Sequence, residues 1–153
     1  MDILTSNSTD RFVAAYLVQE GVEIVRNIRD TNWINQRDWR TGLYEEEGVD
    51  CITNGCQADY KTFGTGTSPL VPYAGDILKM DENGFYNYSN GVDTKYKRKI
   101  VIEPLQTPEG ADDVLRVEVT VFWTEKANLF SDNPCANPES CSITAEEFLY
   151  NWY

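Results

Sequence analysis

The sequence predicts an α+β domain, in which an N-terminal α-helix packs on an antiparallel sheet of about four strands. Two observations support this prediction. Apolar residues recur at helical spacing near the N-terminus, and several later segments alternate between apolar and polar residues, as half-buried strands do. Every strand-like segment follows the helix-like one, so a helical stem would carry a β-rich head. A chain of 153 residues is long enough to bury the core of one such domain.

The first element is a helix expected over residues 9–34. Its packing and assembly face is predicted to comprise Val13, Leu17, Gly21, Ile24 and Ile28. Gly21 is unusual there, because glycine inside a helix costs about 1 kcal/mol relative to alanine. Two explanations stay open: a tolerated defect, or the close approach of a strand or a neighbouring helix. The residues that could cap the start of the helix are Ser8, Thr9 and Asp10.

Residues 36–75 lack sustained periodicity and are expected to form a long loop region held by a cross-link. The chain contains four cysteines, in two local pairs. Sequence alone allows three connectivities. Neither pair has the Cys-x-x-Cys spacing that zinc favours, so we expect two disulfides that pin loops, formed by Cys51, Cys56, Cys135 and Cys141. Disulfides imply an oxidising setting outside the cytoplasm.

Residues 76–153 are expected to form the antiparallel sheet, including a loop closed by cysteines. A hairpin is predicted where residues 77–80 and 85–88 flank the turn Asp81-Glu82-Asn83-Gly84, because Asn-Gly tolerates positive φ. We read this turn as structural first, with a calcium loop as the weaker alternative.

Two longer strands are expected over residues 96–103 and 115–123. In the second, Leu115, Val117, Val119 and Val121 would face the core. Residues 142–153 could form a short helix, since Thr144 and Glu147 have capping-box spacing. We instead expect a final edge strand.

The amino-acid composition mainly excludes classes of function. The formal net charge is −12 with a pI near 4.3, so no basic footprint for nucleic acid is present. Solubility explains this charge, and cation binding is the alternative, for example at residues 45–50. The chain has no histidine, which removes the commonest general base and most catalytic zinc sites. No cofactor, metal site or catalytic residue is therefore expected.

Two further motifs have competing explanations. Residues 95–99 form a basic cluster that could contact polyanions, although alternate residues of a strand face opposite ways, so protection of a strand edge is favoured. Asn7-Ser8-Thr9 and Asn87-Tyr88-Ser89 match the glycosylation acceptor pattern, which occurs often by chance.

The segment Ala-Ala-Tyr-Leu-Val-Gln-Glu-Gly-Val-Glu-Ile-Val-Arg-Asn-Ile-Arg-Asp-Thr-Asn-Trp (14–33) resembles the post-membrane helix of bacterial type IV pilin-like proteins, above all minor pilins and type II secretion pseudopilins. The segments 97–102, 119–125 and 148–152 are similar to head-domain strands of this group. The resemblance implies a precursor with a leader and an apolar helix that is both membrane anchor and filament core. Neither is visible here, so we expect that Met1 stands in for a removed N-terminal segment.

The expected function is that of a non-catalytic structural subunit at the bacterial cell surface, with other pilin or pseudopilin subunits as partners. The resemblance also implies a parent protein anchored in the membrane before assembly, and it gives the 135–141 pair a counterpart in the family's C-terminal cysteine-closed loop. One alternative is an adhesin-like module that binds a sugar, a surface or a cation through residues 36–75 or 126–141. Another is a glycosidase that uses two carboxylates.

Overall fold

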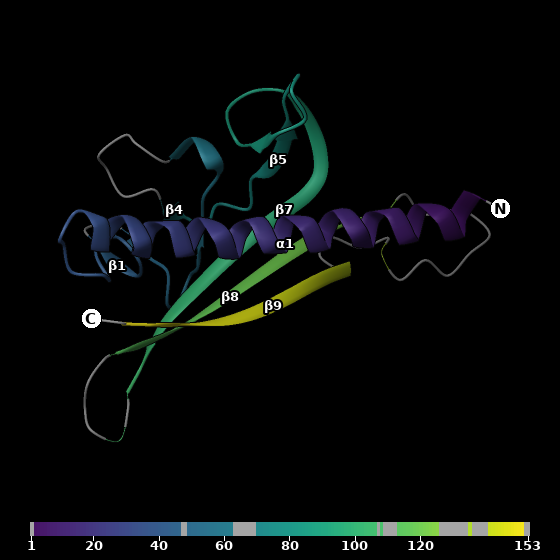
Figure 1. Cartoon of the computed structure of the whole chain (residues 1–153). Helices are drawn as coiled ribbons and strands as arrows, with labels where there is room; N and C mark the ends of the chain where they lie inside the picture. Colours follow the sequence, from purple (N-terminus) through teal and green to yellow (C-terminus); the bar gives the residue numbers. More distant parts are fainter. Residues whose placement is uncertain are drawn as a thin grey trace.

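The computed structural model shows one long helix lying across a curled antiparallel sheet (Figure 1). It describes residues 2–46, 49–62, 70–106, 108, 113–125, 135 and 141–151. The elements in chain order are α1 (Asp2–Ile34), β1 (Glu45–Glu46), β2 (Val49–Asp50), β3 (Cys56–Gln57), the 3-10 helix η1 (Tyr60–Thr62), β4 (Val71–Pro72), β5 (Ile77–Met80), β6 (Tyr86–Asn87), β7 (Val92–Leu105), β8 (Val114–Trp123) and β9 (Cys141–Tyr150).

The predicted α+β architecture with about four strands is wrong. The main sheet has seven strands, and the described chain is mostly β apart from α1. The strands that the sequence did not predict are β3 and β4, which are two residues each. Segments this short show no alternation, so residues 36–75 gave no strand signal although two of their strands join the main sheet.

Three long strands form the body of the sheet. β8 pairs with β7 along ten consecutive residues, from Tyr96↔Trp123 to Leu105↔Val114, and it pairs with β9 over a matching length on its other side. The second edge of β7 is shared between β5, near the start of β7, and β3, at Ile100. β6 and β4 extend the sheet beyond β5 and β3, and β1 and β2 make a separate pair. The sheet therefore branches on one side of β7 and ends in a single long strand on the other.

Strand β8 shows why the long strands could be predicted. Its odd-numbered residues from Leu115 to Trp123 are buried, and its even-numbered residues are partly exposed. This alternation follows from the pleat, which sends successive side chains to opposite faces. The final segment is an edge strand, β9, as expected, and not a short helix.

The β5–β6 hairpin forms at the predicted place. Gly84 has φ 83°, in the left-handed region that glycine adopts without a steric penalty. The Asp81 carboxylate closes the turn, since it accepts hydrogen bonds from the backbone N–H groups of Asn83 and Phe85 at 2.9 and 3.0 Å. These hydrogen bonds support the structural explanation of this turn.

Helix α1 begins earlier than the sequence indicated. It is helical from Asp2, so the expected N-cap at Ser8, Thr9 or Asp10 is wrong. Its other end is fixed by Asn32, whose buried side-chain amide donates to the backbone carbonyls of Trp39 and Thr41 at 3.1 and 2.8 Å. The chain leaves the helix through Gln36, which has φ 55°. The helix is thus tied to the loop that follows it.

Candidate functional site: the two faces of helix α1

The predicted packing face of α1 lies against the sheet. Leu17, Ile24 and Ile28 belong to the buried core, and Val13 packs against that core while remaining partly exposed. Since these side chains are enclosed within the chain itself, they offer little surface to a neighbouring molecule. The sequence therefore located a packing face correctly, but most of that face is internal.

Gly21 marks the closest approach of helix and sheet. A β-carbon placed on Gly21 would lie 2.7 Å from Cγ1 of Val119 on β8 and 3.0 Å from Cδ of Arg98 on β7. A separation of 2.7 Å is too short for any real β-carbon. Of the two explanations left open by the sequence, the close approach of a strand is the one that the structure bears out.

Arg98 is a fully buried cation that joins three parts of the chain. Its Nη1 donates to the backbone carbonyl of Leu17 at 3.0 Å and to the Glu20 carboxylate at 2.7 Å, both on α1. Its Nη2 donates to the carbonyl of Ala58 at 2.7 Å, in the segment after β3. A buried charge is tolerated only with such partners, so Arg98 fixes helix, sheet and loop relative to one another.

A second buried contact lies closer to the N-terminus of α1. The phenol of Tyr96 on β7 donates to the Asp10 carboxylate at 3.0 Å, and Lys95 forms an ion pair with the same carboxylate. Burial of Tyr96, together with this hydrogen bond to Asp10, raises the pKa of the phenol above its usual value. Asp10, one of the three residues that could have capped the helix, instead anchors the helix to β7.

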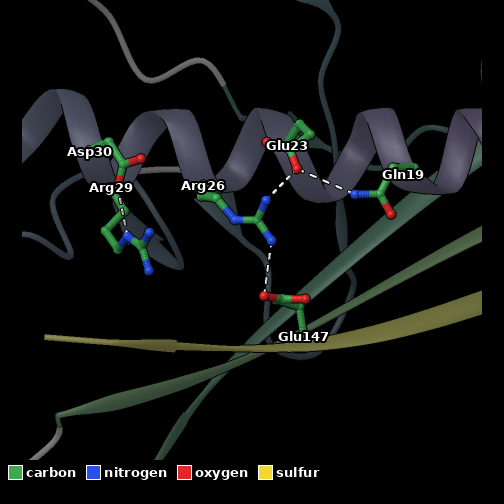
Figure 2. Close-up of polar contacts among 6 residues, drawn as sticks. All are labelled: Gln19, Glu23, Arg26, Arg29, Asp30 and Glu147. Carbon is green, nitrogen blue, oxygen red and sulfur yellow. Dashed lines mark hydrogen bonds and ion pairs between the residues drawn. The ribbon is translucent and has the colours of Figure 1, made fainter.

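A third polar connection joins α1 to the edge strand β9 (Figure 2). Arg26 donates to Glu147 on β9 at 2.9 Å and is also paired with Glu23 one turn earlier on the helix. The hydrogen bond to Glu147 raises the pKa of the Arg26 guanidinium. All three side chains are partly exposed, so this pairing contributes less to stability than the buried ones.

The opposite face of α1 is open and changes character along the helix. Near the N-terminus it carries Phe12, which is 75% exposed, and Tyr16, which is 56% exposed. Tyr16 lies one turn after Phe12, and its ring is 6.3 Å from that of Tyr86 on β6. Further along, the exposed or partly exposed residues are polar: Gln19, Glu23, Asn27 and Asp30. Sequence periodicity missed this aromatic pair because it sought the buried stripe alone.

Both expected disulfides are present, each within a local pair. Cys51–Cys56 connects the segment after β2 to β3, and both cysteines are fully buried. Cys135–Cys141 attaches the start of β9 to the segment that follows β8. The backbone N–H of Glu125 donates to the carbonyl of Cys135 at 2.7 Å, which places this disulfide beside the β8–β9 pair. The second disulfide thus anchors the edge strand of the sheet.

The basic cluster at residues 95–99 is divided between the two faces of β7. Tyr96 and Arg98 point into the core, whereas Lys97 and Lys99 lie on the other face, with Lys99 over the ring of Tyr73 at 5.4 Å. The cluster is therefore not a continuous basic surface. Its buried arginine could have been found from the sequence, because Arg98 alternates in step with Ile100 and Ile102.

The remaining sequence motifs do not form a functional site among the described residues. Asn87 is fully buried and accepts hydrogen bonds from the backbone N–H groups of Ser89 and Asn90, so it is not accessible as a glycosylation acceptor in the folded chain. Most of the proposed binding segment 126–141, and the side chains of residues 45–48 and of Asn7, lie outside the described residues. In the described ranges, no group of three or more acidic or cysteine side chains is placed to hold a metal ion.

The resemblance implies a membrane anchor, so the length and hydropathy of α1 can be compared with those of a membrane-spanning helix. Within the part of the chain that the structure describes, no helix combines the length and the apolar character that a bilayer crossing requires. Comparison with known proteins adds no identification: no family model, no curated protein and no solved structure matches this chain.

Proposed function

We propose that this protein is a non-catalytic structural subunit of a bacterial surface filament, of the minor pilin or pseudopilin kind. The observation that supports this proposal most is the aromatic pair Phe12 and Tyr16 on the open face of α1. Large apolar side chains on a helix surface are usually covered, and here the sheet covers the opposite face. A helix of a neighbouring subunit is the partner that we propose for this pair.

The assembly surface proposed here differs from the one that helical periodicity indicated. Because Leu17, Ile24 and Ile28 are enclosed in the core, contact between subunits would use the open face of α1. Covering an aromatic side chain contributes roughly 1.5–3 kcal/mol, and a filament repeats the contact at every subunit. A helix of 33 residues is about 50 Å long, which allows staggered contact with more than one neighbour.

The attachments of α1 to the sheet suit a subunit in a filament under load. Arg98 and Asp10 hold the helix through buried polar contacts, and the Arg26–Glu147 pair adds one at the sheet edge. The two disulfides are consistent with a location outside the cytoplasm, and we place the assembled protein at the cell surface. The polar contacts would keep the sheet attached to α1 while the helix transmits force along the filament.

Shearing of surface filaments from the producing cells tests this proposal. We expect the wild-type chain in the sheared filament fraction, and we expect Phe12→Asp with Tyr16→Asp to remain outside it while still folding. Asn27→Asp, on the polar part of the same face, is the matched control and should assemble normally. A wild-type chain absent from the filament fraction would reject the assignment.

A second candidate function is that of an adhesin-like binding module, and one feature favours it. Tyr60 and Phe85 are both exposed, and their ring centroids lie 5.4 Å apart beside the β5–β6 turn. Adjacent exposed rings could stack on a sugar or another flat ligand. Binding on a glycan array that is lost in Tyr60→Ala and Phe85→Ala would support this function, and an array without any signal would remove it.

A further inference from the structure

Strand β9 is a long and regular sheet edge. It runs for ten residues without a register shift against β8, and in the described part of the chain no other strand pairs with it. It contains no proline, glycine or lysine. The other outer strands of the sheet differ, because β6 and β4 are two residues each and β4 contains Pro72. Short length and proline are common ways of preventing a strand edge from pairing, and β9 uses neither.

The backbone groups that face away from β8 can be identified from the register. Asn151 N–H donates to the carbonyl of Asp113 at 3.1 Å, and these residues extend the Val114↔Tyr150 pairing by one step. Since hydrogen-bonded and non-hydrogen-bonded pairs alternate in an antiparallel ladder, the odd-numbered residues of β9 bond to β8. The even-numbered residues therefore direct their N–H and C=O groups outward, among them Ser142, Thr144, Glu146 and Phe148.

The charge near this edge is negative on both faces of the sheet. On the face away from α1, Arg116 is paired with Glu103 and Glu146, and Glu118 lies directly opposite Glu146. On β8 and β9 this leaves the carboxylates of Glu118 and Glu146 against one guanidinium, an excess of one negative charge, while Lys97 and Lys99 of β7 lie on the same face beyond β8. On the helix side, Arg26 faces Glu23 and Glu147, which leaves one more. β9 itself has no cationic residue.

Apolar residues flank these charges. Phe148 is 41% exposed on the outer face, and Ile143 and Ala145 are only partly covered on the helix side. An added strand would therefore meet carboxylates near the centre of β9 and apolar side chains on either side. A second copy of β9 fits poorly, since antiparallel pairing about the strand centre would bring Glu146 and Glu147 of both copies together in a chain of net charge −12.

We propose that β9 is a docking site for an extended cationic segment of another protein, which adds to the sheet as an antiparallel strand. Backbone hydrogen bonds to Ser142, Thr144, Glu146 and Phe148 supply affinity, as in other cases of strand addition. Specificity comes from consecutive Lys or Arg residues opposite Glu146 and Glu147, flanked by β-branched or aromatic residues. This site is separate from the α1 surface and does not rest on the filament function.

A synthetic peptide Thr-Val-Tyr-Lys-Arg-Val-Thr-Val with blocked ends is the probe, and the same peptide with Glu-Glu at its centre is the control ligand. Calorimetry with the full chain is expected to show saturable binding of the first peptide that weakens with salt, and at least about tenfold weaker binding of the second. Amide hydrogen exchange should slow at Thr144, Glu146 and Phe148. Absence of binding, or equal binding of both peptides, overturns the proposal.

Two variants locate the site. Thr144→Pro removes an outward N–H that β8 does not use and should weaken binding by about tenfold. Glu146→Lys adds two positive charges at the edge and is expected to remove most of the preference for the Lys-Arg peptide, even if the proline variant folds poorly. Glu82→Lys, in the hairpin turn, makes the same change in net charge and should bind like the wild type. Unchanged binding in Glu146→Lys, or a wild-type dimer that Thr144→Pro abolishes, contradicts a cationic partner strand.

Discussion

Gly21 of α1 lies directly over Val119 of β8, so that a β-carbon on Gly21 would fall 2.7 Å from Cγ1 of Val119. Gly21→Ala should therefore destabilise the protein, although alanine favours a helix by about 1 kcal/mol over glycine. We expect a net loss of about 1–2 kcal/mol, measured by urea unfolding, because overpacking outweighs the gain in propensity.

The matched control for this change is Ala15→Gly, at an exposed position of the same helix, which reports propensity alone. Val119→Ala removes the methyl group that the added β-carbon would contact. The double variant Gly21→Ala with Val119→Ala should therefore lose less free energy of unfolding than the sum of the two single losses. A Gly21→Ala variant as stable as the wild type would show that the helix can move away from the sheet at little cost.

Arg98→Met is expected to destabilise the fold by about 3 kcal/mol, because the change leaves Glu20 and two backbone carbonyls without their buried cation. Lys97→Met, on the opposite face of β7, is the control and should lie within about 0.5 kcal/mol of wild type. Thermal and urea unfolding measure both. If the two variants had similar free energies of unfolding, Arg98 would not have the structural role that its contacts indicate.

Removal of the Cys135–Cys141 disulfide should loosen the edge strand while the centre of the sheet stays intact. The two cysteines are six residues apart, for which loop-closure entropy gives about 2 kcal/mol. In Cys135→Ser with Cys141→Ser, amide exchange is expected to rise near the start of β9 and to stay slow in the central part of β7. Equal acceleration in both strands would mean that the disulfide supports the whole sheet.

The phenol of Tyr88 links stability to alkaline pH. Burial raises the pKa of Tyr88 to about 12, and its hydroxyl has no hydrogen-bond partner among the described residues. Since the unfolded phenol ionises near pH 10, the stabilising contribution is complete below pH 10 and is lost as pH rises toward 12. Unfolding free energy should fall by up to about 1.4 kcal/mol per pH unit in this window.

Tyr88→Phe should remove this part of the pH dependence. Urea unfolding between pH 9 and about 12 measures the effect. An identical alkaline loss in the wild type and in Tyr88→Phe would assign the dependence to other groups.

The parts of the fold that the sequence predicts are those with a repeating local pattern. The burial of alternate β8 residues, the Asn-Gly hairpin and the final edge strand all follow from side-chain periodicity or turn chemistry. Strands β3 and β4 could not be predicted in this way, because β3 is a strand through its pairing with Ile100 and Pro72, which lie far away in the chain. The strand count was too low for this reason.

In the candidate site, too, the sequence predicted some features and missed others. Periodicity found the buried side of α1, including Leu17 and Ile24, but it assigned these residues a second role in assembly that their burial does not allow. Arg98 was grouped with its lysine neighbours, because charge patterning treats a basic run as one surface. Successive side chains of a strand point to opposite faces of the sheet, so Arg98 lies on the same buried face as Ile100 and Ile102.

Photo-crosslinking at position 12 in the producing cells tests the assembly of this protein through α1 most directly. With Phe12 replaced by a benzophenone amino acid, we expect covalent adducts with another subunit in the sheared filament fraction. The same replacement at Tyr60, on the exposed hairpin side, should give no such adduct. If position 12 yields only uncrosslinked monomer while the protein is folded and present at the cell surface, the open face of α1 is not an assembly surface.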